Sequence, residues 1–184
     1  HLFNWYNPGP RAPLPPAYVS TVDSGNLAAA CVTVASALRD SAPSLAARAT
    51  ALFDAMDFRF LFDRRRQLLA IGYQAADSDG AGRLDPSYYD LLASEARVAS
   101  FLAIAKGDVP ETHWFHLGRP VTSVRGAPAL LSWSATLFEY LMPLLVMRSY
   151  PDTLLDASCR LAVRRQIDYA ADHHVPWGIS ESAY

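Results

Sequence analysis

The sequence predicts an all-α fold, a toroid of paired helices that is present only in part, with one short β-hairpin inserted. Apolar residues recur at helical spacing in successive stretches, and the loops between these stretches are rich in aromatic and polar residues. About five helices fit this pattern, which is too few to close a toroid. We therefore expect residues 1–184 to be a single domain that is truncated at its C-terminus.

The N-terminal third alternates extended and helical patterns. Residues 1–18 are rich in proline and aromatic residues, which excludes a regular helix and indicates an extended segment. The polar cluster 20–26 follows, in which Asp23 or Ser24 can cap a helix that continues through Leu38. A second helix is expected to begin at Pro43, because proline suits the first helical position.

The hydrophobic period then changes from helical spacing to strand spacing. Residues 58–63 and 67–73 are short apolar runs joined by three arginines, and they predict the β-hairpin. The arginines are more typical of a solvated turn than of a phosphate site, because a nucleic-acid site needs more positive surface than this chain offers.

The longest helix that the sequence predicts runs from Asp85 to Lys106. Asp85 is a good N-cap, Pro86 suits the first helical position, and Gly107 is a plausible C-cap. Glu95 would then lie in the middle of the apolar face of this helix. A carboxylate there costs stability unless it is paired, so it predicts either an ion pair with a neighbouring arginine or a catalytic group in a cleft.

The C-terminal half is read as a connector followed by two helices. Residues 108–128 form the connector, and residues 132–147 read as a nearly apolar helix with Glu139 as its only charge and a kink at Pro143. A further helix is expected from Pro151 to about residue 171.

Composition excludes several classes of function. Hydrophobic residues make up 51% of the chain and charged residues 18%, which is typical of a folded domain. A net charge of −2 gives no reason to expect nucleic acid. His113 and His116 have a helical metal-ligand spacing but no third ligand nearby, so we expect neither a metal nor another cofactor.

Several blocks, taken together, resemble the glucoamylase-like region of bacterial cyclic β-1,2-glucan synthases. The resemblance covers nearly the whole chain, in order, and the blocks that carry it are residues 20–28, 83–97, 113–115, 131–134, 138–143 and 177–184. It implies an (α/α)6 barrel that cyclises linear β-1,2-glucan by anomer-retaining transglycosylation. It also implies a place between other domains of a larger membrane-bound synthase, on the cytoplasmic face of the bacterial inner membrane, for a segment that is itself soluble and has no transmembrane helix.

The same resemblance implies roles for two carboxylates. Glu95 matches the nucleophile of the family, and Glu181 matches its general acid/base, which acts through a substrate hydroxyl. Retaining glycoside chemistry needs such a pair of carboxyl groups. The residues that we expect to contact sugar are Asp23, Tyr88, Tyr89, Asp90, Trp133, Glu139, Trp177 and Tyr184.

Two alternatives to the cyclising enzyme stay open from the sequence. An endo-β-1,2-glucanase would use the same carboxylates, because cyclisation and hydrolysis differ only in acceptor sites and in the exclusion of water. A non-catalytic carbohydrate-binding or scaffolding fragment of the same fold is favoured by the abrupt end of the chain at Tyr184.

Overall fold

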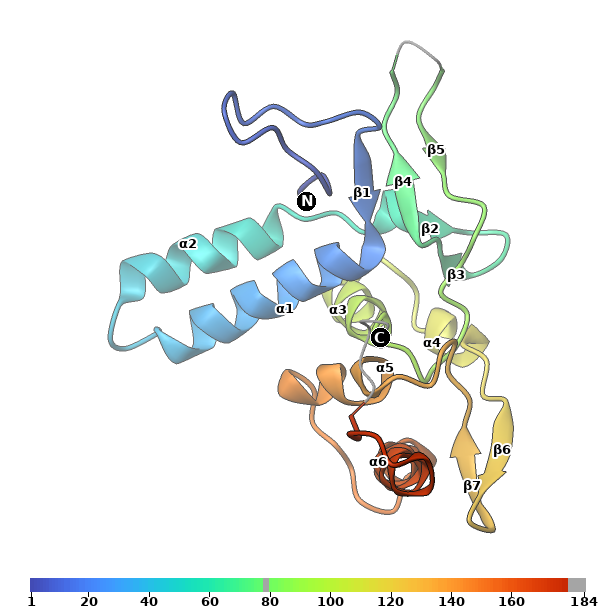
Figure 1. Ribbon diagram of the computed structural model, residues 1–184. Helices are drawn as coiled ribbons and strands as arrows, with labels where there is room; N and C mark the ends of the chain where they lie inside the picture. The colour runs from blue at the N-terminus through green and yellow to red at the C-terminus, as the bar shows by residue number, and fades with distance from the viewer. Residues whose placement is uncertain (78–79, 179–184) are drawn as a thin grey trace. The chain divides into compact units, whose positions relative to one another are not determined.

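The computed structural model describes residues 1–77 and 80–178 and has a mixed α/β architecture. Three small antiparallel sheets alternate with the helices, so the prediction of an all-α toroid is wrong (Figure 1). The contacts divide the chain into two compact units. Unit 1 comprises His1–Asp90 and Val98–His116, and unit 2 comprises Leu91–Arg97 and the residues from Leu117 onward.

Unit 1 begins with a strand that leads directly into a helical pair. In chain order its elements are β1 (Tyr18–Ser20), α1 (Thr21–Ala37), α2 (Pro43–Asp54), the 3-10 helix η1 (Arg59–Leu61), β2 (Phe62–Asp63), β3 (Leu68–Leu69), β4 (Gly72–Gln74), β5 (Arg83–Leu84), most of α3 (Arg97–Lys106) and α4 (Thr112–His116). The helix pair α1 and α2 lies side by side, and Pro43 begins α2 as predicted (Figure 1). The hairpin expected near residues 58–73 is present as β2 paired with β3.

The start of α1 is fixed by Ser20 and not by Asp23 or Ser24. The Ser20 hydroxyl accepts a hydrogen bond from the Asp23 N–H at 3.1 Å, which satisfies one of the free donors of the first helical turn. Ser20 is also the last residue of β1, whose backbone pairs with β4 in a three-stranded sheet of order β1-β4-β5. The strand pairing therefore determines which of the polar residues becomes the cap.

Unit 1 packs around a core that requires a close approach of α1 and α3. The buried core residues are Ala28, Met56, Phe58, Leu61, Phe62, Leu69, Ala99, Ala103 and Val109. Gly25 on α1 faces Ala99 so closely that a Cβ atom added at residue 25 would lie 2.6 Å from the Ala99 Cβ. This glycine is needed for packing, since it removes the side chain that would hold the two helices apart.

The helix predicted from Asp85 begins only at Arg97. The backbone of residues 85–89 is paired with residues 69–72: the Asp85 N–H donates to the Gly72 carbonyl at 2.9 Å, and the Tyr89 N–H donates to the Leu69 carbonyl at 3.0 Å. Long-range pairing of these backbone groups overrides the helical pattern of the apolar residues. The C-terminal end is as predicted: Gly107 follows Lys106 with a φ of 81°, a conformation that glycine adopts readily.

Unit 2 contains a β-hairpin that the sequence analysis read as connector. Its elements are β6 (Val121–Val124), β7 (Ala127–Leu130), α5 (Leu137–Leu141), the 3-10 helix η2 (Met142–Leu145) and α6 (Leu154–His173). Arg125 and Gly126 form the turn between β6 and β7, with φ values of 52° and 79°. A two-residue hairpin turn of this kind needs positive φ at both positions, and arginine in the first of them is not a usual signal.

The helix expected over residues 132–147 is reduced to α5 followed by η2. Thr136 is the N-cap of α5, and its side chain accepts from the Glu139 N–H. Pro143, in η2, lacks the N–H that a continuing α-helix would need. The last helix, α6, begins after Thr153 and not at Pro151, because the Thr153 hydroxyl accepts from the Asp156 N–H at 3.2 Å. Among the helices described here, over residues 1–77 and 80–178, none combines the length and the apolar character that crossing a membrane requires.

The contact between Gly25 and Ala99 gives a test of the unit 1 core. We expect Gly25→Ala to lower the free energy of unfolding by about 1–3 kcal/mol, because overpacking outweighs the gain in helix propensity. Propensity alone would stabilise the helix by about 1 kcal/mol, so the two effects predict opposite signs. Chemical denaturation measures the change, with Gly9→Ala on the exposed N-terminal segment as the control. A stabilised Gly25→Ala variant would contradict the packing that we describe.

Candidate functional site

A polar site in unit 2 is the loop that surrounds the carboxylate of Glu139. This carboxylate is 5% exposed. Its oxygens accept from the hydroxyls of Ser132 and Ser134 at 3.1 and 2.8 Å, and from the N–H groups of Trp133 and Thr136 at 2.9 and 3.0 Å. The Ser134 N–H also donates to it at 3.1 Å. A single buried carboxylate therefore holds the whole loop from residue 132 to residue 136.

The hydrogen bonds of this loop determine the protonation of Glu139. Burial by itself would raise the pKa of the Glu139 carboxyl, but the donors of Ser134, Thr136 and Ser132 outweigh burial and lower it. Glu139 is thus ionised at neutral pH and has its lone pairs occupied by the loop. A carboxylate in this state is suited to holding a loop and not to giving up a proton.

The loop presents Trp133 to solvent. Its N–H is bound to Glu139, while its side chain is 61% exposed. An exposed indole that is fixed at its backbone offers a flat apolar surface at a small cost in conformational entropy. This arrangement suits stacking against the apolar face of a sugar ring, and Trp133 and Glu139 were both expected near a sugar.

Arg97 is the second organising residue of unit 2, and the sequence analysis assigned it no role. Its side chain is 1% exposed, and burial lowers the pKa of its guanidinium. The guanidinium donates to the carbonyl oxygens of Ser94 and Glu139, both at 2.8 Å, and to that of Tyr140 at 2.6 Å. Arg97 therefore ties the turn at residues 94–97 to the end of α5.

Pro143 explains why one of these carbonyl groups, that of Glu139, needs Arg97. In a continuing α-helix the Glu139 carbonyl would accept from the N–H of residue 143. Proline has no N–H, so this buried acceptor would be left without a helical partner. The Arg97 guanidinium supplies the missing donor, and its positive charge lies at the C-terminal end of α5, where the helix dipole favours a cation.

Glu95 lies in the turn that Arg97 holds. It is half-buried, precedes α3, and accepts a hydrogen bond from the Ser94 hydroxyl at 3.3 Å. It is therefore not on a helix face as the sequence predicted, although it is carried by an equally constrained backbone. Glu95, Trp133, Glu139 and Trp177 all belong to unit 2. Arg97 connects the turn of Glu95 to α5, which contains Glu139 in its first turn.

The other expected sugar contacts belong to unit 1. Asp23 is exposed in the first turn of α1, beside a cavity of about 260 Å³ that Phe3 also lines. The Tyr88 hydroxyl donates to Asp63 at 2.8 Å and its ring lies under the Arg66 guanidinium, whose carbon is 4.8 Å from the ring centroid. Tyr89 and Asp90 follow in the segment that pairs with residues 69–72, and both are half-buried.

The C-terminal candidates are described only in part. Trp177 is 54% exposed. The expected acid/base Glu181 and the expected sugar contact Tyr184 lie outside the described residues, so their roles remain predictions.

His113 is used inside the core of unit 1. Its Nδ1 lies 2.9 Å from the Gln67 carbonyl oxygen and its Nε2 lies 2.9 Å from the Ser100 hydroxyl, so the neutral ring donates through Nδ1 and accepts through Nε2. Burial lowers its pKa, which keeps it neutral. Within the described part of the chain, no three metal-ligating side chains gather at one place. Metal independence of any activity stays a prediction.

Glu139→Gln should destabilise the protein by about 2–3 kcal/mol, because the new amide group would face the N–H donors of the loop. The lowered pKa makes this loss depend on pH. Ionised Glu139 stabilises the fold above its ordinary pKa of 4.5, and this stabilisation disappears as the pH falls through the lower pKa of the folded state. The difference in the free energy of unfolding between wild type and Glu139→Gln should therefore be constant at neutral pH and become smaller in acid. Denaturation at several pH values measures it, with the exposed Glu111→Gln as control, and a difference that does not vary with pH would contradict the assignment.

Arg97→Lys should lower the free energy of unfolding by about 2–4 kcal/mol, because the lysine ammonium cannot reach both the Ser94 carbonyl and the carbonyls of α5 at once. If Pro143 creates the need for Arg97, the loss should be smaller by about 1 kcal/mol in a Pro143→Ala background, where residue 143 regains its N–H. A double-mutant cycle by chemical denaturation measures this coupling. Arg164→Lys on the exposed side of α6 is the matched control. Equal losses in the two backgrounds would show that Pro143 and Arg97 are independent.

The chain is similar to part of a much longer curated protein. No protein-family model matches the chain. The chain is 44% identical over 171 residues to cyclic beta-(1,2)-glucan synthase NdvB of Rhizobium meliloti (strain 1021), and the alignment covers 88% of this chain. The chain spans 6% of the length of that curated relative.

Proposed function

We propose that this chain processes β-1,2-glucan by anomer-retaining transglycosylation and joins the ends of linear chains into rings. Glu95 acts as the nucleophile and Glu181 as the general acid/base. The similarity to a protein named as a cyclic β-(1,2)-glucan synthase supports the substrate, although the match covers only 6% of that protein. The proposal concerns the chemistry and does not depend on a toroidal fold.

The single observation that carries the proposal is the way Glu95 is held. Its turn is fixed through the Ser94 carbonyl by a buried arginine, whose guanidinium also holds two carbonyls of α5. A nucleophile must be kept in one position by its surroundings, because small displacements of the reacting atoms slow the reaction strongly. Glu95 is half-buried, so part of it faces solvent, whereas Glu139 is buried and accepts hydrogen bonds from its own loop.

The proposed reaction uses each carboxyl group once in each half. Glu95 attacks the anomeric carbon, the glycosidic bond breaks, and a proton from Glu181 neutralises the leaving oxygen. A hydroxyl at the other end of the same chain then attacks the glycosyl-enzyme ester while Glu181 takes back the proton. Each half of the reaction inverts the configuration of the anomeric carbon, so the product keeps the configuration of the substrate. Water in place of the sugar hydroxyl would make the same site an endo-glucanase.

The exposed Trp133 fits this chemistry as a stacking surface for a glucosyl unit. Trp177, also exposed, and Tyr184 are proposed for the same task near Glu181, and Asp23, Tyr88, Tyr89 and Asp90 as further sugar contacts. We further propose that residues 1–184 work as one glycan-processing domain within a larger membrane-associated synthase, with β-1,2-glucan on the cytoplasmic side as substrate. The resemblance of the motif blocks supports this placement, and the similarity to a glucan synthase of which the chain covers 6% supports a larger synthase.

Glu95→Gln tests the proposal, because it keeps the shape and removes the nucleophile. Incubated with linear β-1,2-glucan, the variant should lose turnover by at least about 1,000-fold, with Kd changed by no more than about two-fold, since the lost interaction belongs to the transition state. Anion chromatography of the products measures turnover, and NMR of the anomeric protons shows retention. Glu111→Gln is the matched control. Glu95→Gly with azide should recover turnover and yield a glycosyl azide of inverted configuration.

Each possible outcome is informative. Near-normal turnover of Glu95→Gln would overturn the assignment. Binding of β-1,2-glucan by the wild-type chain without any turnover would show a non-catalytic carbohydrate-binding function instead. Linear products of lower mass, without rings, would show hydrolysis.

A further inference from the structure

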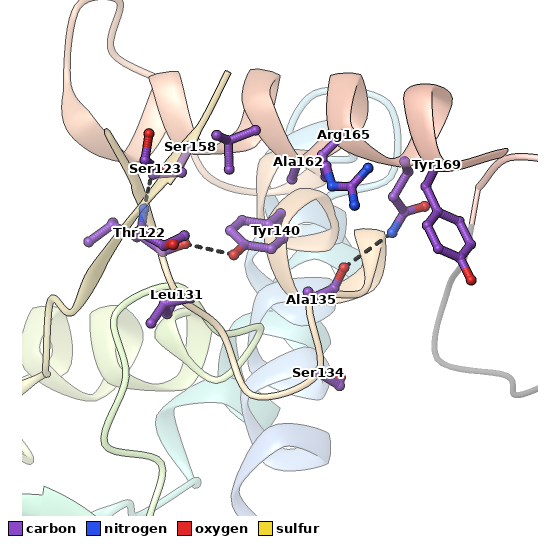
Figure 2. A pocket seen from close by; sticks show the side chains of 14 residues that line it. Thr122, Ser123, Leu131, Ser134, Ala135, Tyr140, Ser158, Ala162, Arg165 and Tyr169 are labelled. Carbon is purple, nitrogen blue, oxygen red and sulfur yellow. Dashed lines mark hydrogen bonds between the residues drawn. The ribbon is translucent and has the colours of Figure 1, made fainter. Parts of the chain in front are cut away.

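Unit 2 contains a cavity of about 420 Å³ between the hairpin β6–β7 and α6. This volume falls within the range of about 300–1,000 Å³ that is typical of small-molecule sites. Figure 2 shows the lining side chains, with Thr122 and Ser123 from the hairpin and Ala162, Arg165 and Tyr169 from α6. Leu130, Leu131 and Tyr140 contribute the apolar part of the wall.

The walls of the cavity are held by hydrogen bonds that do not need a ligand. The Tyr140 hydroxyl donates to the Leu130 carbonyl at 2.7 Å, and the Leu130 N–H donates to the Ser158 hydroxyl at 2.8 Å (Figure 2). At the tip of the hairpin, Arg125 forms a bidentate ion pair with Asp168 on α6, with both contacts at 2.6 Å. The hairpin is thus fixed to α6 at both ends of the cavity, which makes the cavity preformed.

The polar groups at the mouth differ from those in the wall. Over residues 1–77 and 80–178, neither Thr122 nor Ser123 forms a side-chain hydrogen bond, and Arg165 has no carboxylate within ion-pair distance. The Arg165 guanidinium carbon lies 5.8 Å from the centre of the Tyr169 ring, which stacks on His173 with 4.0 Å between centroids. The mouth therefore offers two hydroxyls, a guanidinium and an aromatic ring around an apolar interior.

We propose that this cavity binds a glucosyl unit of β-1,2-glucan, as a secondary site that holds the chain apart from Glu95. A pyranose ring has apolar C–H faces and a rim of hydroxyl groups, which matches an apolar wall with hydroxyl and guanidinium donors at its mouth. The identity of the sugar rests on the proposed function. Ser134 and Ala135 also line the cavity, so it adjoins the loop that Glu139 holds and that presents Trp133.

The wall chemistry favours a neutral sugar over an anion. Arg165 is exposed at the mouth, and the remaining polar lining groups are hydroxyls and an amide. A site for a phosphate or a carboxylate normally surrounds the anion with several charged or N–H donors. Among the described residues, the cavity has only one charged donor in its lining, Arg165 beside the Tyr169 ring, and this guanidinium can donate hydrogen bonds to sugar hydroxyls.

Two pairs of matched variants test the site in the 184-residue chain. Arg165→Gln removes the donor at the mouth, and Arg164→Gln makes the same change outside the lining. Ala162→Leu fills the cavity, and Ala171→Leu adds the same volume on the exposed side of α6. Binding of a β-1,2-linked glucose disaccharide and tetrasaccharide is followed by NMR shift mapping and calorimetry. Glucuronate, inorganic phosphate and a β-1,4-linked disaccharide are the comparison ligands.

We expect both β-1,2-linked sugars to shift the signals of residues in the cavity wall and to bind more tightly than the comparison ligands. Arg165→Gln should weaken binding at the cavity by about 10-fold, whereas Arg164→Gln should change it by no more than about two-fold. Ala162→Leu should abolish the shifts in the cavity, and Ala171→Leu should leave them. If Ala162→Leu fails to fold, the arginine pair decides the question.

Three results would overturn the proposal. They are the absence of shifts in the cavity with either sugar, equal binding by the Arg165 and Arg164 variants, and tighter binding of glucuronate or phosphate than of the neutral sugars. Glu95→Gln separates this proposal from the proposed function. It should leave sugar binding at the cavity unchanged while turnover is lost. Retained turnover in that variant would remove Glu95 as nucleophile and leave the mapped cavity as a sugar site.

Discussion

The buried guanidinium of Arg97 is the interaction on which unit 2 depends. It sits between the turn that carries Glu95 and the end of α5, and it donates to the Glu139 carbonyl, which Pro143 leaves without a helical donor. Its charge would be costly to bury without these acceptors. Glu139 lies in the first turn of α5, and its carboxylate holds the loop of Trp133. One arginine and one glutamate thus hold the two segments of unit 2 that bear Glu95 and Trp133.

The chain shows how surroundings assign different tasks to chemically identical side chains. Glu139 is surrounded by donors, which lower the pKa of its carboxyl and leave it no free lone pair for a substrate. Glu95 is half-buried and accepts a hydrogen bond from the Ser94 hydroxyl, so its surroundings differ from those of Glu139. Glu139 is therefore assigned a structural task, whereas the role of Glu95 as nucleophile is a proposal.

Local signals in the sequence predicted the helix pair and the β2–β3 hairpin, but they misplaced the elements around the site. The helical pattern from Asp85 was overridden because residues 85–89 pair with a distant strand segment, which no local window reveals. Two features that were not predicted do have local signals in the sequence. Thr136 and Glu139 have the spacing of a capping box, which marks the start of α5, and Pro143 implies an unpaired carbonyl at Glu139. The partner of that carbonyl, Arg97, lies 42 residues away and could only come from the structure.

Trapping the glycosyl-enzyme intermediate tests the central claim most directly, namely that Glu95 attacks the anomeric carbon. A β-1,2-linked gluco-oligosaccharide with an activated leaving group would be mixed with the chain, quenched in acid and digested for mass spectrometry. The account predicts one glycosyl ester, on the peptide that contains Glu95, with an α-linked sugar. An ester on Glu139, or product formation with inverted configuration and no ester, would contradict it.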